Sequence, residues 1–342
     1  MDGEKVAAKP AIRAPEPAER SVFPEDFPEG LKPRLRLFLS VDLVGATRYK
    51  QSRNRWRPEI LSFYRDFDFI LQSEYRTFVQ GYAEAFEPPQ FWKSNGDEML
   101  YVCEISSLSH AQALMHVWLW ALHRYQLQRD PTDEHLEVKS TAWVGLFPAP
   151  NSEVFFRRGG PSLDTDGARD ANVVQSELRD EWYANPATPS ITREFVGPSI
   201  DTGFRLTSWA TPNRLILSVD LAFLLTSSDP EGLGPLTLRL SGQEKLKGVI
   251  DDQPYPTIWI PVGGQGWAGV DGGPVVTDRA TIRSYCEAVI EQNYSSITPL
   301  FLGEEQTAYE WAPQYILNRI LKLWEEETRH RDAVTKVVRF GE

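Results

Sequence analysis

The pair Asn95-Gly96 constrains the fold of this chain more than any other short stretch. It separates two apolar runs, because residues 91–92 precede it and residues 99–102 follow it closely. Asn-Gly between apolar segments is the strongest short-range signal for a two-residue β-hairpin, since both residues tolerate positive φ. The sequence therefore predicts two antiparallel strands here, with Asp97 at a strand end beside the turn.

A second acidic residue ends the strand predicted before this hairpin. Residues 35–42 are mostly apolar, indicate a central strand and end at Asp42. Two carboxylates at the tips of neighbouring strands are the arrangement that a two-metal phosphoryl-transfer site needs. Each divalent ion is a hard cation that prefers oxygen ligands, and substrate phosphates complete its shell. Asp42 and Asp97 are therefore the first candidates for a metal site.

The hydrophobic spacing around these strands predicts an α+β fold. Helical spacing runs from about residue 58 to 82, and an amphipathic helix at about 109–129 precedes a strand at about 137–147. Together with the strand at 35–42 and the hairpin, this gives the order β-α-β-β-α-β, the ferredoxin-like split pattern. Residues 150–190 are less regular. After them we expect a helix at 197–210, a strand at 214–219 and a strand pair near 235–262.

Composition divides the chain into three parts. Residues 1–33 alternate Pro, Ala and charged residues, which is typical of a disordered arm. Residues 34–262 contain the predicted α+β domain. Residues 263–342 begin with a glycine-rich linker at 263–273 and continue as a helical extension, with helices expected at 278–296 and 306–330.

Charge and cysteine content exclude several classes of function. The net charge of -12 argues against nucleic acid or an anionic membrane as a partner. Cys103 and Cys286 are the only cysteines, and they form neither a disulfide framework nor a zinc ligand set. There is no signal peptide and no long uncharged apolar run, so we expect a cytoplasmic protein.

Three motifs resemble those of the class III nucleotidyl cyclases, the adenylate and guanylate cyclase catalytic domains. Three such motifs in the family's order are specific, and the resemblance covers about residues 35–262. In one departure, the family's ribose-orienting Asn is Asp201 here. Within the family, the chain is most similar to the pyrimidine (uridylate and cytidylate) cyclases of Pycsar antiphage defence. The motifs are Asp-hydrophobe-x-Gly-x-Thr at 42–47, Lys-x-x-Gly-Asp at 93–97 and Gly-x-x-Val-Asn-x-x-x-Arg at 197–205.

The resemblance implies a reaction and a metal requirement. The ribose 3′-oxygen attacks the α-phosphorus of a nucleoside triphosphate, and diphosphate leaves. Asp42 and Asp97, helped by the carbonyl of Leu43, would hold two divalent cations, Mn²⁺ or Mg²⁺. The resemblance also implies that Lys247 reaches the triphosphate.

The residues around the motifs suggest how phosphates are held. Gly45, Ala46 and Thr47 follow a strand and precede a helix, so their N–H groups can cradle phosphates or simply form a tight turn. Arg205 lies four residues after Asp201 on the same helix face and can donate two hydrogen bonds to the α-phosphate. Arg48, Lys50 and Arg53 supply positive charge near this loop or form a solvated surface.

The base would be recognised by Lys93 and Glu194, which match the family's two base-selecting positions. Lysine only donates and ionised glutamate only accepts, a combination that complements uracil, cytosine and also adenine. Tyr49 is expected to narrow the pocket toward a single ring. We therefore expect UTP to be the preferred substrate, with CTP next and ATP as an open alternative.

The resemblance also implies partners. Its members form homodimers with shared active sites, in which one chain gives the metal ligands and the other gives Asp201 and Arg205. The cyclic nucleotide would be a second messenger in antiviral defence and act on a separate effector. One alternative is a catalytically silent cyclase-homology dimer, which the presence of both aspartates and Arg205 disfavours. Another is a diguanylate cyclase, which needs Gly-Gly where this chain has Asn95-Gly96.

Overall fold

The structure is a computed structural model that describes ten stretches of the chain. Most of the N-terminal segment that was predicted to be disordered (residues 1–33) lies outside them, and so does nearly all of the linker predicted at 263–273. No side chain is described beyond residue 330. The described stretches are 23–24, 26–54, 56–81, 86–128, 136–157, 171–186, 188–227, 234–263, 275–303 and 312–340.

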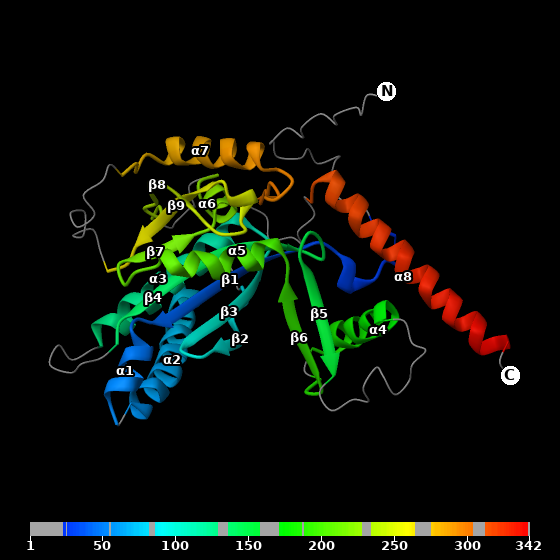
Figure 1. Ribbon diagram of the computed structural model, residues 1–342, viewed down its shortest axis with the longest axis horizontal. Coiled ribbons are helices and arrows are strands. Elements are labelled where there is room, and N and C mark those ends of the chain that lie inside the picture. Colours follow the sequence, from blue (N-terminus) through cyan, green and yellow to red (C-terminus); the bar gives the residue numbers. More distant parts are fainter. Residues whose placement is uncertain are drawn as a thin grey trace.

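A seven-stranded mixed sheet forms the centre of the molecule (Figure 1), with the strand order β2-β3-β1-β4-β7-β9-β8. The first four positions are the ferredoxin-like order that the βαββαβ pattern predicts, and the other three strands extend the sheet. The α+β prediction is therefore confirmed. The strands are β1 (Arg34–Leu43), β2 (Gln90–Asn95), β3 (Glu98–Ile105), β4 (Val138–Phe147), β7 (Arg214–Leu217), β8 (Arg239–Lys245) and β9 (Pro254–Pro261).

Strand β1 is central because its side chains are buried on both faces. Leu37 and Leu39 face one side and Phe38 faces the other, and none of the three is exposed. The strand pairs antiparallel with β3 and with β4, so that Asp42 lies opposite Glu98 on one side and Lys139 on the other. The predicted strand at 35–42 and the predicted hairpin are confirmed. The two turn residues are Gly96 and Asp97, one position later than the predicted Asn95 and Gly96, because Asn95 still pairs with Glu98 at the end of the strands.

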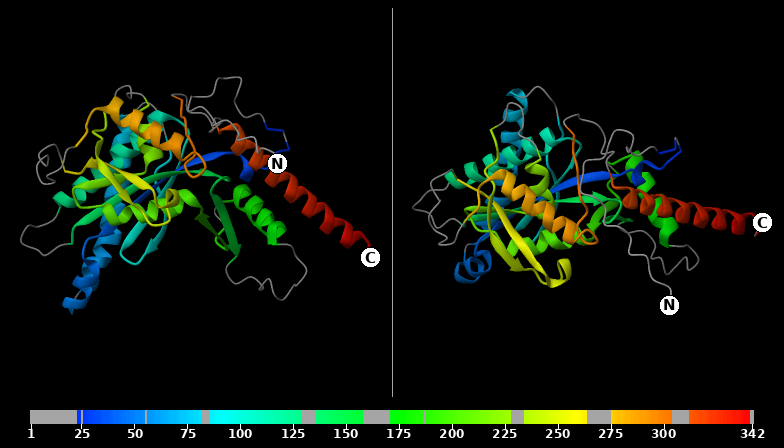
Figure 2. Two further views of the ribbon diagram at one scale, coloured as in Figure 1. Left: turned by 45° about the horizontal axis from the view of Figure 1, so that its top comes forward. Right: turned by 90° about the horizontal axis from the view of Figure 1, so that it is seen from above.

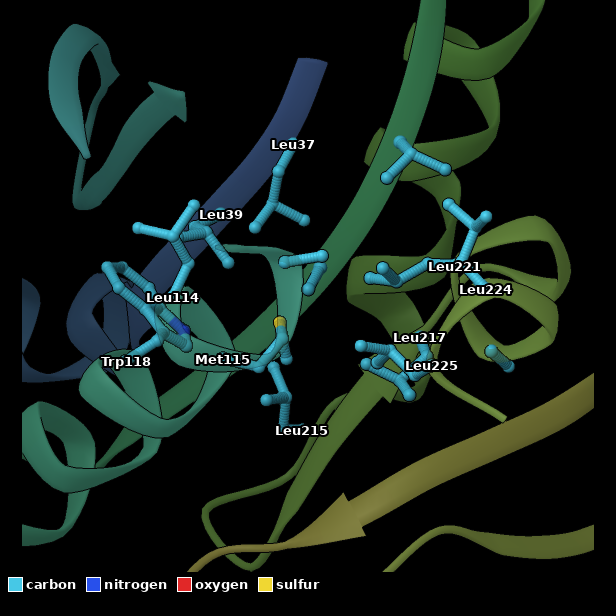
Figure 3. Packing of buried hydrophobic residues seen from close by; sticks show 14 of the residues in the cluster. Leu37, Leu39, Leu114, Met115, Trp118, Leu215, Leu217, Leu221, Leu224 and Leu225 are labelled. Carbon is cyan, nitrogen blue, oxygen red and sulfur yellow. The ribbon is translucent and has the colours of Figure 1, made fainter. Parts of the chain in front are cut away.

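Helices cover the face of the sheet to which Leu37 and Leu39 point. In the close view of Figure 3, Leu37 and Leu39 of β1 lie near Leu114 and Trp118. The sheet's apolar face is thus sealed by long amphipathic helices, as their spacing predicts. The helices of this layer are α2 (Arg57–Gly81), α3 (Leu108–Leu127), α6 (Val219–Leu225) and α7 (Arg279–Gln292), of which α7 packs on α6.

The opposite face carries an aromatic cluster under helix α5 (Pro198–Leu206). Phe38 stacks on Trp143 of β4 with ring centroids 5.5 Å apart. Gly203 brings α5 close to this ring, since a Cβ at that position would lie 2.2 Å from Trp143. The helix continues into the short 3₁₀ turn η3 (Thr207–Trp209), so the helix predicted at 197–210 is confirmed.

The prediction that residues 150–190 are irregular is wrong for the part of this segment that the structure describes. A separate two-stranded antiparallel sheet is formed by β5 (Ser152–Arg157) and β6 (Ile191–Val196), and helix α4 (Ala171–Ala184) packs on it. We call β5, α4 and β6 the arm. Its apolar cluster is small, with Phe155, Leu178 and Ile191 at its centre, so the sequence pattern is weak.

The C-terminal helix α8 (Gln314–Phe340) begins later and ends later than the helix predicted at 306–330. It runs along the arm and then away from the body of the protein (Figures 1 and 2). Arg179 of α4 donates two hydrogen bonds to Glu327 of α8, at 2.7 and 2.8 Å. The α8 helix therefore holds the arm from outside.

Three short elements complete the fold, and the sequence pattern did not indicate them. They are η2 (Glu29–Leu31), α1 (Ala46–Ser52) and η4 (Ile250–Asp252). Phe27, just before η2, is buried and packs edge-on against Trp324 of α8, so the predicted disorder does not hold for residues 26–33. Within the described residues, no helix is both long and apolar enough to cross a membrane.

Candidate active site

The ends of the central strands bring Asp42 and Asp97 to one cavity. Asp42 lies near the end of β1, Asp97 is in the turn before β3, and the amide of Leu43 donates to the carbonyl of Asp97 at 3.3 Å. The cavity of about 380 Å³ is also lined by residues 43–47 and 210–212. The predicted carboxylates and the predicted phosphate loop therefore lie together, as the strand order suggests.

Each carboxylate is paired with a lysine. Lys139 Nζ lies 3.2 Å from Asp42, and Lys50 Nζ lies 3.1 Å from Asp97. Burial raises the pKa of the Asp42 carboxyl, and the charge of Lys139 opposes that rise. Lys139 also donates to the carbonyl of Thr207 at 3.4 Å, just after the helix that carries Arg205.

Sequence reasoning missed Lys139 as a site residue. The contact between Lys139 and Asp42 could have been predicted by pairing the strand expected at 137–147 with the strand expected at 35–42. In an antiparallel register that joins these two strands, a lysine near the start of one falls opposite an aspartate near the end of the other. Lys50 was expected near the phosphate loop, and its contact with Asp97 bears this out.

A buried hydrogen-bonded network links β1, β3 and β4 next to the strand ends at Asp42 and Asp97. Ser40 Oγ donates to Glu98 Oε1 at 2.8 Å, and Thr141 Oγ1 donates to Ser40 Oγ at 3.1 Å. Burial raises the pKa of Glu98, and the bond from Ser40 opposes this. The network fixes the backbone next to Asp42 and Asp97, because buried polar groups that are satisfied resist displacement.

The donor set of this cavity suits a hard divalent cation. Two carboxylates and the nearby backbone carbonyl of Leu43 offer oxygen atoms only. Among the residues that the structure describes, no group of three or more His, Cys, Asp or Glu side chains is arranged to hold a metal. Any ion bound here would therefore take its remaining ligands from water or from a substrate.

The loop at 45–47 forms the beginning of a helix. Gly45 has a left-handed φ of 73° and is the N-cap of α1, so Ala46 and Thr47 occupy its first turn. Ala46 is buried and Thr47 is exposed. The left-handed conformation explains the glycine, because other residues rarely adopt it.

The two predicted base-selecting residues form an ion pair. Lys93 Nζ of β2 lies 3.0 Å from Glu194 Oε2 of β6, and both side chains are about one-third exposed. The ammonium lies 4.1 Å from the ring centre of Trp92 and 5.6 Å from that of Phe204. Tyr49 instead lies in α1, beside Lys50 and the carboxylate cavity. The aromatic rings described around Lys93 are thus Trp92 and Phe204, which sequence reasoning missed.

Asp201, Arg205 and Lys247 form a third group around α5. Asp201 and Arg205 are exposed, and the Arg205 guanidinium lies 3.6 Å from where a Cβ on Gly248 would be. Lys247, the preceding residue, is exposed as well. Gly248 has a left-handed φ of 72°, which glycine adopts readily and other residues rarely adopt.

Within one chain the predicted residues therefore form separate groups. In the described part of the chain, no hydrogen bond or ion pair joins Asp42 or Asp97 directly to Asp201 or Arg205. Their cavities also have different linings, since Asp201 lines one with Asp220 and Gly248. In one chain Asp42, Asp97 and Asp201 therefore line two cavities and do not form a single site.

No family model matches this chain, and no curated protein matches it. Among solved structures, the adenylyl cyclase CyaB from P. aeruginosa is similar at 13% identity, covering 69% of this chain and 97% of that chain, with a TM-score of 0.44. The guanylate cyclase domain of RhGC from Catenaria anguillulae, in complex with GTP, is 10% identical over 67% of this chain and 97% of that chain, with a TM-score of 0.42. A bacterial light-regulated adenylyl cyclase is 8% identical over 77% of this chain and 99% of that chain, with a TM-score of 0.41. At these values the similarity does not by itself indicate an activity.

Proposed function

We propose that this protein is a nucleotide cyclase that converts a nucleoside triphosphate to its 3′,5′-cyclic monophosphate and diphosphate. The observation that carries the proposal is the cavity in which Asp42 and Asp97 meet the backbone of residues 43–47. Carboxylate oxygens and peptide N–H groups in one cavity suit a metal-bound polyphosphate.

Asp42, Asp97 and the carbonyl of Leu43 would hold two divalent cations, Mn²⁺ or Mg²⁺. Such ions, when bound, lower the pKa of the 3′-hydroxyl and neutralise charge on the phosphates. The chain's own lysines keep both carboxylates paired, with Lys139 at 3.2 Å and Lys50 at 3.1 Å. Gly45, Ala46 and Thr47 would donate backbone hydrogen bonds to the phosphates.

Arg205 would donate to the α-phosphate, on which negative charge develops as the 3′-oxygen attacks. A preorganised donor of this kind is worth about 3–4 kcal/mol of transition-state stabilisation. Lys247, close to Arg205 through Gly248, would hold the rest of the triphosphate. Asp201, one helical turn before Arg205, would accept a hydrogen bond from the ribose.

The separation of these groups in one chain supports a homodimer with two shared sites. Each site would take Asp42 and Asp97 from one chain and Asp201, Arg205 and Lys247 from the other. A twofold dimer places the same pair of surfaces together twice, so the two sites are equivalent. Residues 34–262 would form this catalytic domain, and 263–342 its extension.

The ion pair between Lys93 and Glu194 places a hydrogen-bond donor beside an acceptor. This pair is complementary to a nucleobase that has an acceptor next to a donor. Uracil presents a carbonyl next to N3–H, so UTP is the favoured substrate and CTP the next. The cyclic product would then serve as a second messenger for antiviral defence, in the cytoplasm, through a separate effector.

Adenylate cyclase activity is the second candidate, because the same ion pair suits adenine. Adenine N1 accepts and N6–H donates, which matches Lys93 and Glu194 equally well. A silent cyclase-homology dimer is disfavoured, since Asp42 and Asp97 are both present and paired with lysines, and Arg205 is present as well.

A competition experiment tests the reaction. Purified protein with Mn²⁺ receives ATP, GTP, CTP and UTP at equal concentration, and mass spectrometry identifies the cyclic products. Asp97→Ala runs in parallel, with Asp66→Ala on α2 as the matched control. Cyclic UMP or CMP made by the control and not by Asp97→Ala supports the proposal. Cyclic AMP favours the second candidate, and no product from any nucleotide contradicts both.

Subunit mixing tests the shared site. In a mixed dimer of Asp97→Ala and Arg205→Ala chains, one site carries both defects and the other carries neither. An equal mixture should therefore recover about a quarter of the wild-type rate, whereas each variant alone is inactive. No recovery after chain exchange would contradict sites shared between chains.

A further inference from the structure

A further cavity, which shares only Trp92 with the groups described above, lies between the sheet edge and the arm. Its volume is about 620 Å³. One wall is formed by the edge strand β2 and its neighbour β3, and the other by α4 and β6. The residues that matter for its chemistry are Arg36, Phe91, Trp92, Trp182, Tyr183 and Arg193.

The cavity carries an excess of buried positive charge. The side chains of Arg36 and Arg193 are only 5% and 16% exposed, and both lie beside one carboxylate of Glu153, at 2.9 and 3.5 Å. Glu104 also lies near Arg36, but its side chain is half-exposed. Glu87 at the rim of the cavity is exposed as well. Burial lowers the pKa of Arg193, and the charge of Arg36 adds to this effect. Two buried cations thus share one buried anion.

Behind the cavity wall, some buried polar atoms have no hydrogen-bond partner. Arg36 Nε and Trp92 Nε1 are buried donors without a hydrogen-bond partner. Glu153 Oε1 accepts no hydrogen bond despite its short distance to Arg36, so the guanidinium is not aimed at it. A buried donor without a partner costs about 1–3 kcal/mol, so the packing behind the cavity wall is not optimal for hydrogen bonding.

Aromatic rings complete the walls. The Arg193 guanidinium lies 5.1 Å from the ring centre of Trp182, and Tyr183 follows in the same helix. Phe91 is 52% exposed, and its ring lies edge-on to the buried ring of Tyr101 on β3. Flat apolar surfaces beside convergent donors are typical of sites for small organic ligands.

We propose that this cavity binds a small planar anion, with its carboxylate or phosphate group on Arg36 and Arg193 and its ring against Phe91 and Trp182. The site also adjoins the base-selecting ion pair, because the Lys93 ammonium lies 4.1 Å from the ring centre of Trp92, which lines the cavity. An occupied cavity would set the separation of β2 and β6 and so change the affinity for nucleotide. This second part rests on the proposed function, whereas the binding itself does not.

Binding of 2-naphthoate without metal or nucleotide tests the site. Isothermal titration should give one saturable site per chain, with the uncharged 2-naphthamide at least about tenfold weaker, because the amide lacks the charge. Equal binding of the two compounds, or no binding of 2-naphthoate, would overturn the assignment.

Two matched pairs of variants locate the binding. Arg193→Gln should weaken 2-naphthoate by about tenfold. It leaves Glu153 paired with Arg36 and Tyr183. Arg157→Gln on the same arm should have no effect. Phe91→Ala should weaken binding, and the exposed Phe69→Ala on α2 should not. Wild-type affinity in both Arg193→Gln and Phe91→Ala would place the ligand elsewhere and overturn the assignment.

Activity separates the two parts of the proposal. If 2-naphthoate changes the KM for nucleotide in wild type but not in Arg193→Gln, the coupling is supported. An unchanged KM at saturating 2-naphthoate would overturn the coupling alone. A protein that binds 2-naphthoate but makes no cyclic nucleotide would overturn the proposed function and leave the binding site in place.

Discussion

The central strands and the arm hold their polar side chains in different ways. Asp42 lies in a strand that is paired along its full length on both sides. Glu194 lies in a two-stranded sheet that is fixed by a small apolar cluster, buried charge and the contact with α8. The carboxylate half of the proposed site therefore rests on the most rigid part of the fold, and the base-selecting half rests on an attached element.

This difference separates chemistry from selectivity. Reacting groups need fixed geometry, because a small displacement is costly in rate. A base-reading group tolerates movement better and gains adjustability from it. Changes in the centre should therefore act on kcat and changes in the arm on KM and on the choice of nucleotide.

The largest effect is expected for Asp97→Asn in the centre. Loss of one carboxylate should lower turnover on the order of 10³-fold, since the bound ions supply several kcal/mol of charge stabilisation. The fold should be unaffected, because the pair with Lys50 is partly exposed. Initial rates and chemical unfolding measure both quantities, with Asp66→Asn as the control. A turnover near wild type would remove Asp97 from the proposed mechanism.

Glu327→Gln should loosen the arm without touching the centre. It removes the charge that pairs with Arg179, whose side chain is only 8% exposed, and a charge-assisted hydrogen-bonded pair of this kind contributes about 1.5–3 kcal/mol. Hydrogen exchange should speed up in α4, β5 and β6 but not in β1. The control is the neighbouring Glu326→Gln on α8, where the contact with Lys322 is 4.0 Å long and exposed. Equal acceleration in β1 would show that the arm and the centre open as one unit.

The centre was largely predictable from sequence, whereas the arm was not. The strand at 35–42 and the turn at Asn95-Gly96 have strong local signals, so Asp42 and Asp97 could be placed together. The arm's strands are only six residues long and bury few apolar side chains, so their pattern is weak. Lys139, Trp92 and Phe204 were missed because their roles depend on contacts between elements far apart in the chain.

The centre also contains a buried carboxylate that should make its stability depend on pH. Asp220 lies at the start of α6, and burial raises its pKa from 3.8 to about 6. Since the folded pKa is above the unfolded one, its contribution to stability is present at low pH and is lost as pH rises through about 6. Asp220→Asn, which can still accept from the amide of Leu221, should therefore be more stable than wild type at pH 8 by about 3 kcal/mol.

Urea unfolding at pH 5 and pH 8 measures this difference. The difference in free energy of unfolding between Asp220→Asn and wild type should be smaller at pH 5, because the wild-type carboxyl is then mostly protonated in the folded chain. Asp66→Asn, partly exposed on α2, is the control and should give the same change at both pH values. A gain of equal size at pH 5 and pH 8 would contradict a titrating Asp220.

The smallest effect, and the most direct comparison of the two regions, is expected for Glu194→Gln in the arm. Glutamine keeps one acceptor oxygen but adds a donor, so the preference among nucleotides should change by about tenfold. Because the ion pair with Lys93 is about one-third exposed, its loss should cost little stability. KM values for the four nucleotides in Glu194→Gln and in Glu181→Gln, an arm control that pairs with Arg157, decide the question. If kcat falls instead while the preference among nucleotides is unchanged, Glu194 belongs with the reacting groups. The assignment of chemistry to the centre and of nucleotide selectivity to the arm would then be wrong.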